Sequence, residues 1–110
     1  MRKAILILTC AALTGCAHYT KVLPQSPEKR QAYVEAHPRL PAEVRAAVLD
    51  AKWTIGMTTS DLRVARGVPY DISRTVGEWG IHESWEYRNI SFSIMHFHFE
   101  NDTLRSWSEN

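Results

Sequence analysis

The sequence predicts an α+β fold, in which a layer of two or three helices packs on one face of a three- or four-stranded antiparallel sheet. The first half of the chain has helical spacing and helix-capping residues, and the second half changes to the two-residue alternation of strands. One face of that alternation is apolar and the other is polar, which suits helices on one side only. At 110 residues, the chain forms at most one domain.

Residues 1–15 have the pattern of a bacterial lipoprotein signal peptide. Arg2 and Lys3 precede an apolar run that is too short to span a bilayer. The run ends in Leu13-Thr14-Gly15-Cys16, which resembles a lipobox, the sequence at which such signals are cleaved before a lipidated cysteine. We therefore expect a signal peptide at 1–15, a lipidated tether at 16–25 that begins at Cys16, and a folded domain at 26–110.

This interpretation predicts the compartment and excludes some partners. Cys10 leaves with the signal and Cys16 carries lipid, so no pair remains for a disulfide. Several acyl chains anchor a protein durably. Ala17 stands where an Asp often retains lipoproteins in the inner membrane, which favours the periplasmic face of the outer membrane. Without Arg2 and Lys3, 11 of the 13 basic residues remain against 12 acidic ones, so no attraction to nucleic acid is expected.

Two helices are predicted before residue 52. Ser26-Pro27-Glu28 has an N-cap, a first-turn proline and an early acid, and it starts a helix at 27–36 that Pro38 closes. Its weak apolar stripe predicts a place on the surface of the domain. Pro41 opens a second helix that runs to about Ala51, and its apolar face has spacings of three and four: Leu40, Val44, Ala47, Val48 and Ala51.

A third helix is predicted with both of its ends specified. Thr58 is its N-cap and Asp61 completes a capping box, while Met57 and Leu62 have the spacing of a hydrophobic staple. Gly67 supplies the left-handed turn at the C-terminal end, and the following proline prevents the helix from resuming.

The remaining residues predict strands. They are a short strand at 70–76, a turn at 77–80 that contains Trp79, a strand at 83–88, the strongest strand at Phe92 to Glu100, and a last strand at 103–108. Asn101-Asp102 is a plausible two-residue hairpin turn, since both residues tolerate positive φ at some cost.

A regular ladder from that turn predicts the register of the last hairpin. The opposite pairs are Glu100–Thr103, Phe99–Leu104, His98–Arg105, Phe97–Ser106 and His96–Trp107. One face then collects Met95, Phe97, Phe99 and Leu104, together with Trp85 and Tyr87 of the neighbouring strand. The other face collects His96, His98, Arg105 and Trp107.

Several of these motifs together resemble a known family. Gly56-Met57-Thr58, Gly67-x-Pro69, Trp85-x-Tyr87, and Phe99 and Leu104 around a tight turn look like the SmpA/OmlA (BamE-like) domain of small outer-membrane lipoproteins, over roughly residues 40–108. The resemblance implies helices against a three- or four-stranded antiparallel sheet, similar also to the repeat of the β-lactamase inhibitor protein; here an extra N-terminal helix is added. It also implies a protein-binding role in outer-membrane assembly. The shared residues make the fold, and none of them is catalytic.

Two clusters carry chemically active side chains. His96 and His98 share one strand face, where His82 or Glu100 would complete a metal site, but that face also suits plain solvent exposure. His82-Glu83-Ser84 has the residue types of a hydrolytic triad, yet sequence neighbours on a strand point to opposite faces. We therefore expect no catalytic residues and no resident metal.

The expected function is that of a non-catalytic, lipid-anchored envelope protein, without cofactor, nucleic acid or small-molecule substrate. Its partner would be another envelope protein, with the subunits of the β-barrel assembly machinery as candidates. Its role would be outer-membrane protein assembly or envelope integrity. The expected partner-binding residues are Trp107, Arg105, His98 and His96. One alternative is a periplasmic metal- or pH-responsive module that uses His96 and His98; another is a module that inhibits an enzyme.

Overall fold

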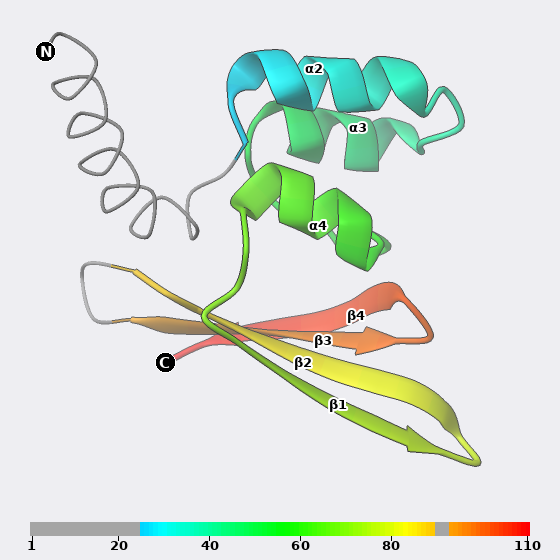
Figure 1. Cartoon of the computed structure of the whole chain (residues 1–110), viewed down its shortest axis with the longest axis vertical. Coiled ribbons are helices and arrows are strands. Elements are labelled where there is room, and N and C mark those ends of the chain that lie inside the picture. The colour runs from blue at the N-terminus through cyan, green and yellow to red at the C-terminus, as the bar shows by residue number, and fades with distance from the viewer. Residues whose placement is uncertain (1–24, 90–92) are drawn as a thin grey trace, which may run out of the picture.

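The computed structural model describes residues 25–89 and 93–110 and has two layers (Figure 1). Helices α2 (Pro27–Ala36), α3 (Ala42–Leu49) and α4 (Thr59–Arg66) lie over one face of an antiparallel sheet, with α4 next to the sheet. The strands are β1 (Asp71–Gly77), β2 (Gly80–Arg88), β3 (Ile94–Glu100) and β4 (Thr103–Glu109), in the order β1-β2-β3-β4. The predicted α+β fold is confirmed. The signal, Cys16 and Phe92 lie outside the described residues.

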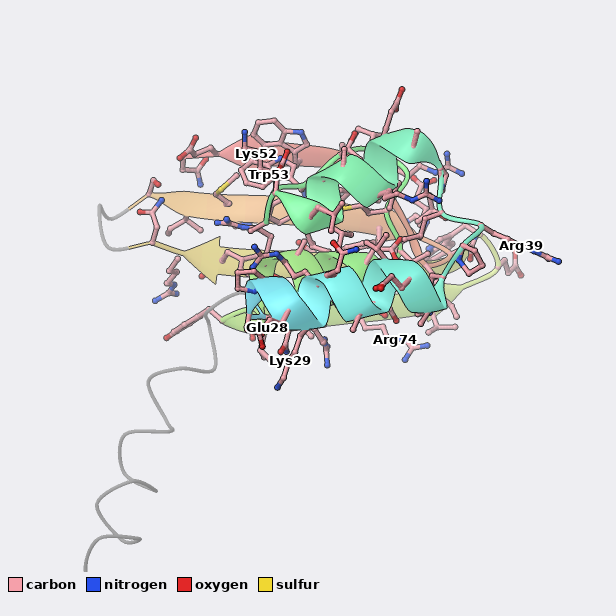
Figure 2. All side chains as sticks on the ribbon, turned by 90° about the horizontal axis from the view of Figure 1, so that it is seen from above. Glu28, Lys29, Arg39, Lys52, Trp53 and Arg74 are labelled. Carbon is pink, nitrogen blue, oxygen red and sulfur yellow. The ribbon has the colours of Figure 1, made fainter. Side chains whose placement is uncertain are left out.

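The first two helices follow their sequence signals closely. The Ser26 side chain accepts a hydrogen bond from Lys29 N–H at 3.3 Å, and Val34 is the buried residue of α2, as expected for a surface helix. Helix α3 ends at Leu49, earlier than predicted, because Ala51 has a φ of 56° that no right-handed helix accommodates. Figure 2 shows α2 and α3 side by side above the sheet.

Helix α4 has the predicted capping box. The Thr58 hydroxyl accepts from Asp61 N–H at 3.1 Å, and the Asp61 carboxylate accepts from Thr58 N–H at 3.0 Å. The same carboxylate accepts from the hydroxyl of Tyr33, which ties α2 to α4. Gly67 ends the helix with φ 90° and ψ −169°, a conformation that is essentially restricted to glycine.

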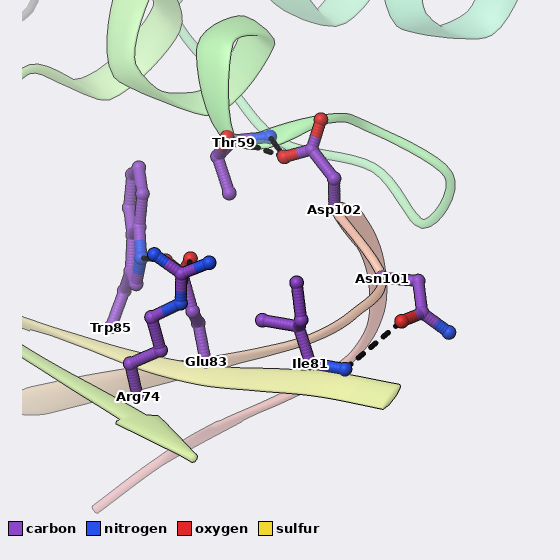
Figure 3. Close-up of polar contacts among 7 residues, drawn as sticks. All are labelled: Thr59, Arg74, Ile81, Glu83, Trp85, Asn101 and Asp102. Carbon is purple, nitrogen blue, oxygen red and sulfur yellow. Dashed lines mark hydrogen bonds and ion pairs between the residues drawn. The ribbon is translucent and has the colours of Figure 1, made fainter. Parts of the chain in front are cut away.

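The last hairpin turns at the predicted residues, and its turn is hydrogen-bonded to β2 and to α4. Asn101 and Asp102 have φ of 48° and 67°, the positive values that a type I′ turn requires. The Asn101 side-chain oxygen accepts from Ile81 N–H at 3.0 Å, and the Asp102 carboxylate accepts from Thr59 N–H at 3.2 Å (Figure 3). The turn is therefore held to β2 on one side and to the first turn of α4 on the other.

The core lies between α4, the other helices and the helix-facing side of the sheet. It contains the predicted apolar face of the sheet together with residues of all three helices: Val34, Val44, Ala47, Val48, Met57, Leu62, Ala65, Trp85, Tyr87, Met95, Phe97, Phe99 and Leu104. Tyr87 donates its hydroxyl proton to the carbonyl of Gly67 at 2.7 Å. Burial raises the pKa of Tyr87 above its ordinary value, although the positive charges of Arg66 and Arg63 oppose the shift.

Candidate partner-binding surfaces

The predicted binding face does not assemble as a set of four residues. His96 and His98 do lie on the face of the sheet that points away from the helices, here called the outer face. They stand opposite Glu86 and Ser84 of β2, which are on that face too. The predicted register fails at the third pair from the turn, however, so the partners of His96 and His98 on β4 are not the predicted ones.

A β-bulge causes this difference. The pair Phe99–Leu104 forms as predicted, but His98 then stands opposite Ser106 instead of Arg105, with a register shift between His98 and Phe99. Arg105 is thus the extra residue of β4, and its Nε lies 4.0 Å from a carboxylate oxygen of Glu100. The predicted pairs His98–Arg105, Phe97–Ser106 and His96–Trp107 are wrong, because one unpaired residue reverses the sides of all that follow.

The bulge carries Trp107 to the helix-facing side. Trp107 stands opposite Phe97, and its ring meets the edge of Trp53 at a centroid distance of 5.3 Å. Trp53, from the connection between α3 and α4, also packs against Phe97 at 5.4 Å and lies under the guanidinium of Arg66. Figure 2 shows Trp53 above the β3–β4 side of the sheet. Trp107 therefore covers the end of the core, with 45% of its surface exposed.

The outer face carries a shallow polar pocket of about 150 Å³. His82 and His98 border it, and Glu100 stands directly opposite His82. In the parts of the chain that the structure describes, no three side chains of the His, Cys, Asp or Glu type are placed to hold a metal ion. Trp79 folds over Gly77 at the hairpin tip, with its ring 6.1 Å from that of His82.

A second, more open cleft of about 690 Å³ lies where α3 ends and β3 begins. Trp53 and Met95 supply apolar surface to it. Acidic and basic side chains, Asp50 and Glu109 beside Lys52 and Arg66, both line it. Arg66 is already engaged, since it donates to the carbonyl of Ala51 at 3.1 Å and stacks on Trp53. Such mixed charges do not select one class of ligand.

Exposed large apolar side chains are concentrated on the first strand and just beside it in sequence, and the sequence did not predict them as a site. Five of the eight large apolar side chains exposed in the described residues fall between positions 68 and 79: Val68 (40%), Tyr70 (57%), Ile72 (42%), Val76 (67%) and Trp79 (60%). We call these five residues the β1 surface. β1 is at the edge of the sheet, and no other element of the described chain pairs with its outer side.

Tyr33 and Arg88 also have shifted pKa values. Burial, followed by the hydrogen bond to Asp61, raises the pKa of Tyr33 above its ordinary value. The Glu86 carboxylate, 2.6 Å from Arg88, raises the pKa of that guanidinium, which also lies 3.7 Å above the ring centre of Tyr70. Arg88 thus holds Tyr70 at the start of β1 without covering the strand.

Comparison of the chain with models of known protein families, with curated proteins and with solved structures gives no match. In residues 25–89 and 93–110, no helix is both long and apolar enough to cross a membrane.

Proposed function

We propose that the chain is a non-catalytic lipoprotein of the bacterial envelope that binds another envelope protein. Lipid on Cys16 anchors it to the periplasmic face of the outer membrane, and the folded domain acts through protein contact in outer-membrane protein assembly or envelope integrity. The signal-like residues 1–15 and the lipobox support the anchor. The SmpA/OmlA-like motifs support the role in assembly.

The observation that carries the proposal is the exposure of the β1 surface. Large apolar side chains scattered singly over a protein are ordinary, whereas a concentration of them indicates an interaction site. Here five such residues lie on one edge strand or just beside it in sequence. The partner would bury them and so gain about 25 cal/mol for each Å² of apolar surface removed from water.

In-cell photo-crosslinking tests this proposal. A photoreactive residue replaces Val76, in the β1 surface, and a matched one replaces Ser106, an exposed position on the opposite edge strand. We expect the Val76 position to crosslink to a defined envelope protein that mass spectrometry identifies, and the Ser106 position to crosslink to it much less. If the crosslinked protein is a subunit of the barrel-assembly machinery, the role in outer-membrane assembly is supported.

Two outcomes would contradict the proposal. One is crosslinking to lipid or to abundant porins alone from Val76; the other is equal crosslinking from both positions. The anchor is tested separately with labelled palmitate. The wild-type chain should carry the label and remain with the outer membrane, whereas Cys16→Ala should lose both properties.

A further inference from the structure

The backbone of β1 has unused hydrogen-bonding groups on its outer edge. Ile81 of β2 donates its N–H to the Asn101 side chain at 3.0 Å, and its carbonyl accepts from Asn101 N–H at 2.8 Å, so both groups point toward β3. Val76 stands opposite Ile81. In an antiparallel pair, residues whose backbone N–H and C=O groups point toward the partner strand alternate with residues whose groups point away from it. The N–H and C=O groups of Ile72, Arg74 and Val76 therefore point away from β2, into solvent.

The two edges of the sheet differ in how they are protected. Edge strands usually avoid unwanted pairing by bulges, charges or a covering element. β4 contains the bulge at Arg105, and most of its exposed residues are polar. β1 pairs with β2 through seven consecutive residues without a register shift, and six of the seven are exposed. Only β1 presents a regular, open ladder along its full length.

The side chains of β1 specify what could pair there. Ile72, Arg74 and Val76 alternate with residues of the outer face, so all three lie on the helix-facing side. Arg74 is in the middle, with 57% of its side chain exposed, and its Nε is 3.9 Å from the Glu83 carboxylate (Figure 3). At that distance and exposure the existing ion pair contributes little. Along the edge, an apolar residue (Ile72), a cationic residue (Arg74) and a second apolar residue (Val76) therefore follow one another on this side.

This pattern disfavours a second copy of the chain. The antiparallel register that pairs all seven residues of two β1 strands places Ile72 against Val76, and it also places Arg74 against Arg74. Like charges directly opposite each other in a sheet are destabilising. An acidic residue at the same place would be stabilising, because opposite charges directly across from each other in a sheet attract.

We propose that β1 binds an extended segment of a different protein by strand addition, and that this segment carries an acidic residue opposite Arg74 between two apolar residues opposite Ile72 and Val76. Main-chain hydrogen bonds to the open edge provide affinity, and alternate side chains provide selectivity. The inference rests on the proposed function, for which it names the mode of binding and the chemistry of the partner.

A designed peptide tests the inference with the full-length chain purified in detergent. The probe is the blocked peptide Thr-Val-Thr-Glu-Thr-Val-Thr, in which glutamate and the two valines match Arg74, Ile72 and Val76. Amide hydrogen exchange is measured by NMR. At a peptide concentration ten times Kd, the amides of these three residues should exchange about tenfold more slowly. The amides of Ser73 and Thr75, which face β2, should change less and serve as an internal control.

Three matched comparisons separate backbone pairing from apolar adhesion. A peptide with N-methylated amides on its pairing edge should give no protection, since it keeps the side chains and loses the donors. A peptide with lysine in place of glutamate should bind about fivefold more weakly. The variant Arg74→Gln should no longer distinguish the glutamate peptide from the lysine peptide.

Failure of this inference can be told from failure of the proposed function. An identified envelope protein crosslinked at Val76, without protection of the outward amides by the glutamate peptide, would overturn strand addition and leave the proposed function intact. Equal binding of the N-methylated peptide or of the lysine peptide would also overturn strand addition. Protection of these amides that appears without peptide and grows with protein concentration would show that β1 pairs with a second copy of the chain. That result would overturn the proposal that its partner is a different protein.

Discussion

At the scale of single residues, Asp61 connects three parts of the helix layer. It is the buried charged residue of the described chain, with 3% of its surface exposed. One carboxylate oxygen accepts from Thr58 N–H, and the other accepts from the hydroxyl of Tyr33 on α2. A buried carboxylate is tolerated only when its oxygens have such partners. Asp61 therefore both starts α4 and holds α2 against it.

The variant Asp61→Asn should destabilise the domain by about 1–3 kcal/mol, the usual cost of a lost charged hydrogen bond at a buried site. The amide has one acceptor oxygen, so it cannot accept from Thr58 and Tyr33 in the same way. Urea unfolding measures the change. Asp71→Asn, at an exposed position of β1, is the matched control and should change the free energy of unfolding by less than about 0.5 kcal/mol. Equal effects of the two substitutions would show that the contacts of Asp61 contribute nothing.

At the scale of elements, the bulge in β4 decides which surface each aromatic residue joins. Leu104 and Trp107 are three positions apart, so a regular strand would place them on opposite faces. The extra residue Arg105 brings both to the helix-facing side, where Trp107 meets Trp53. The bulge also interrupts the edge ladder of β4, which leaves β1 as the regular edge.

Deletion of Arg105 should leave the packing of Trp107 intact, since it removes only the bulged residue. Ser106 then still stands opposite His98, and Trp107 still stands opposite Phe97. Trp53 and Trp107, 5.3 Å apart, should give an exciton couplet in circular dichroism in the wild-type chain and in the deletion variant. Trp107→Phe should abolish it in both backgrounds. A couplet that appears only after the deletion would indicate a regular ladder in the wild-type chain.

At the scale of the whole molecule, two phenol groups join separate parts of the fold. Tyr87 of β2 donates to Gly67 in the connection between α4 and β1, and Tyr33 of α2 donates to Asp61 of α4. The pKa of each is raised above the ordinary value of about 10, in both cases chiefly by burial. The folded state therefore holds both protons more tightly than the unfolded chain does.

This linkage predicts loss of stability in alkali. The contribution of a group with a raised folded-state pKa is complete below its unfolded pKa and declines as the pH rises above it. The free energy of unfolding should fall above about pH 10, and Tyr87 should account for up to about 1.4 kcal/mol per pH unit of the slope. Urea unfolding across this range should show a shallower decline for Tyr87→Phe. Tyr70→Phe, at a more exposed tyrosine, is the control, and an equal decline in both variants would contradict the prediction.

Local sequence patterns were sufficient to predict the three helices, the turn of the last hairpin and the apolar side of the sheet. Caps at Ser26 and Thr58, the positive φ of Gly67 and the Asn101-Asp102 turn are local features, which depend on a few neighbouring residues. Alternation likewise placed Trp85, Tyr87, Met95, Phe97 and Phe99 on one side, because strand periodicity is a property of the backbone.

Which surfaces are exposed depends on contacts between residues that are distant in sequence. The bulge at Arg105 has no turn residue to mark it, and it forms where Trp107 can pack on Trp53, a residue distant in sequence. One such residue removes Trp107 from the predicted site with His96 and His98. The exposure of Ile72 and Val76 could not be predicted from the sequence either, because the alternation of apolar residues is the same in a covered strand and in an edge strand. Which strand becomes the edge depends on the order of the whole sheet.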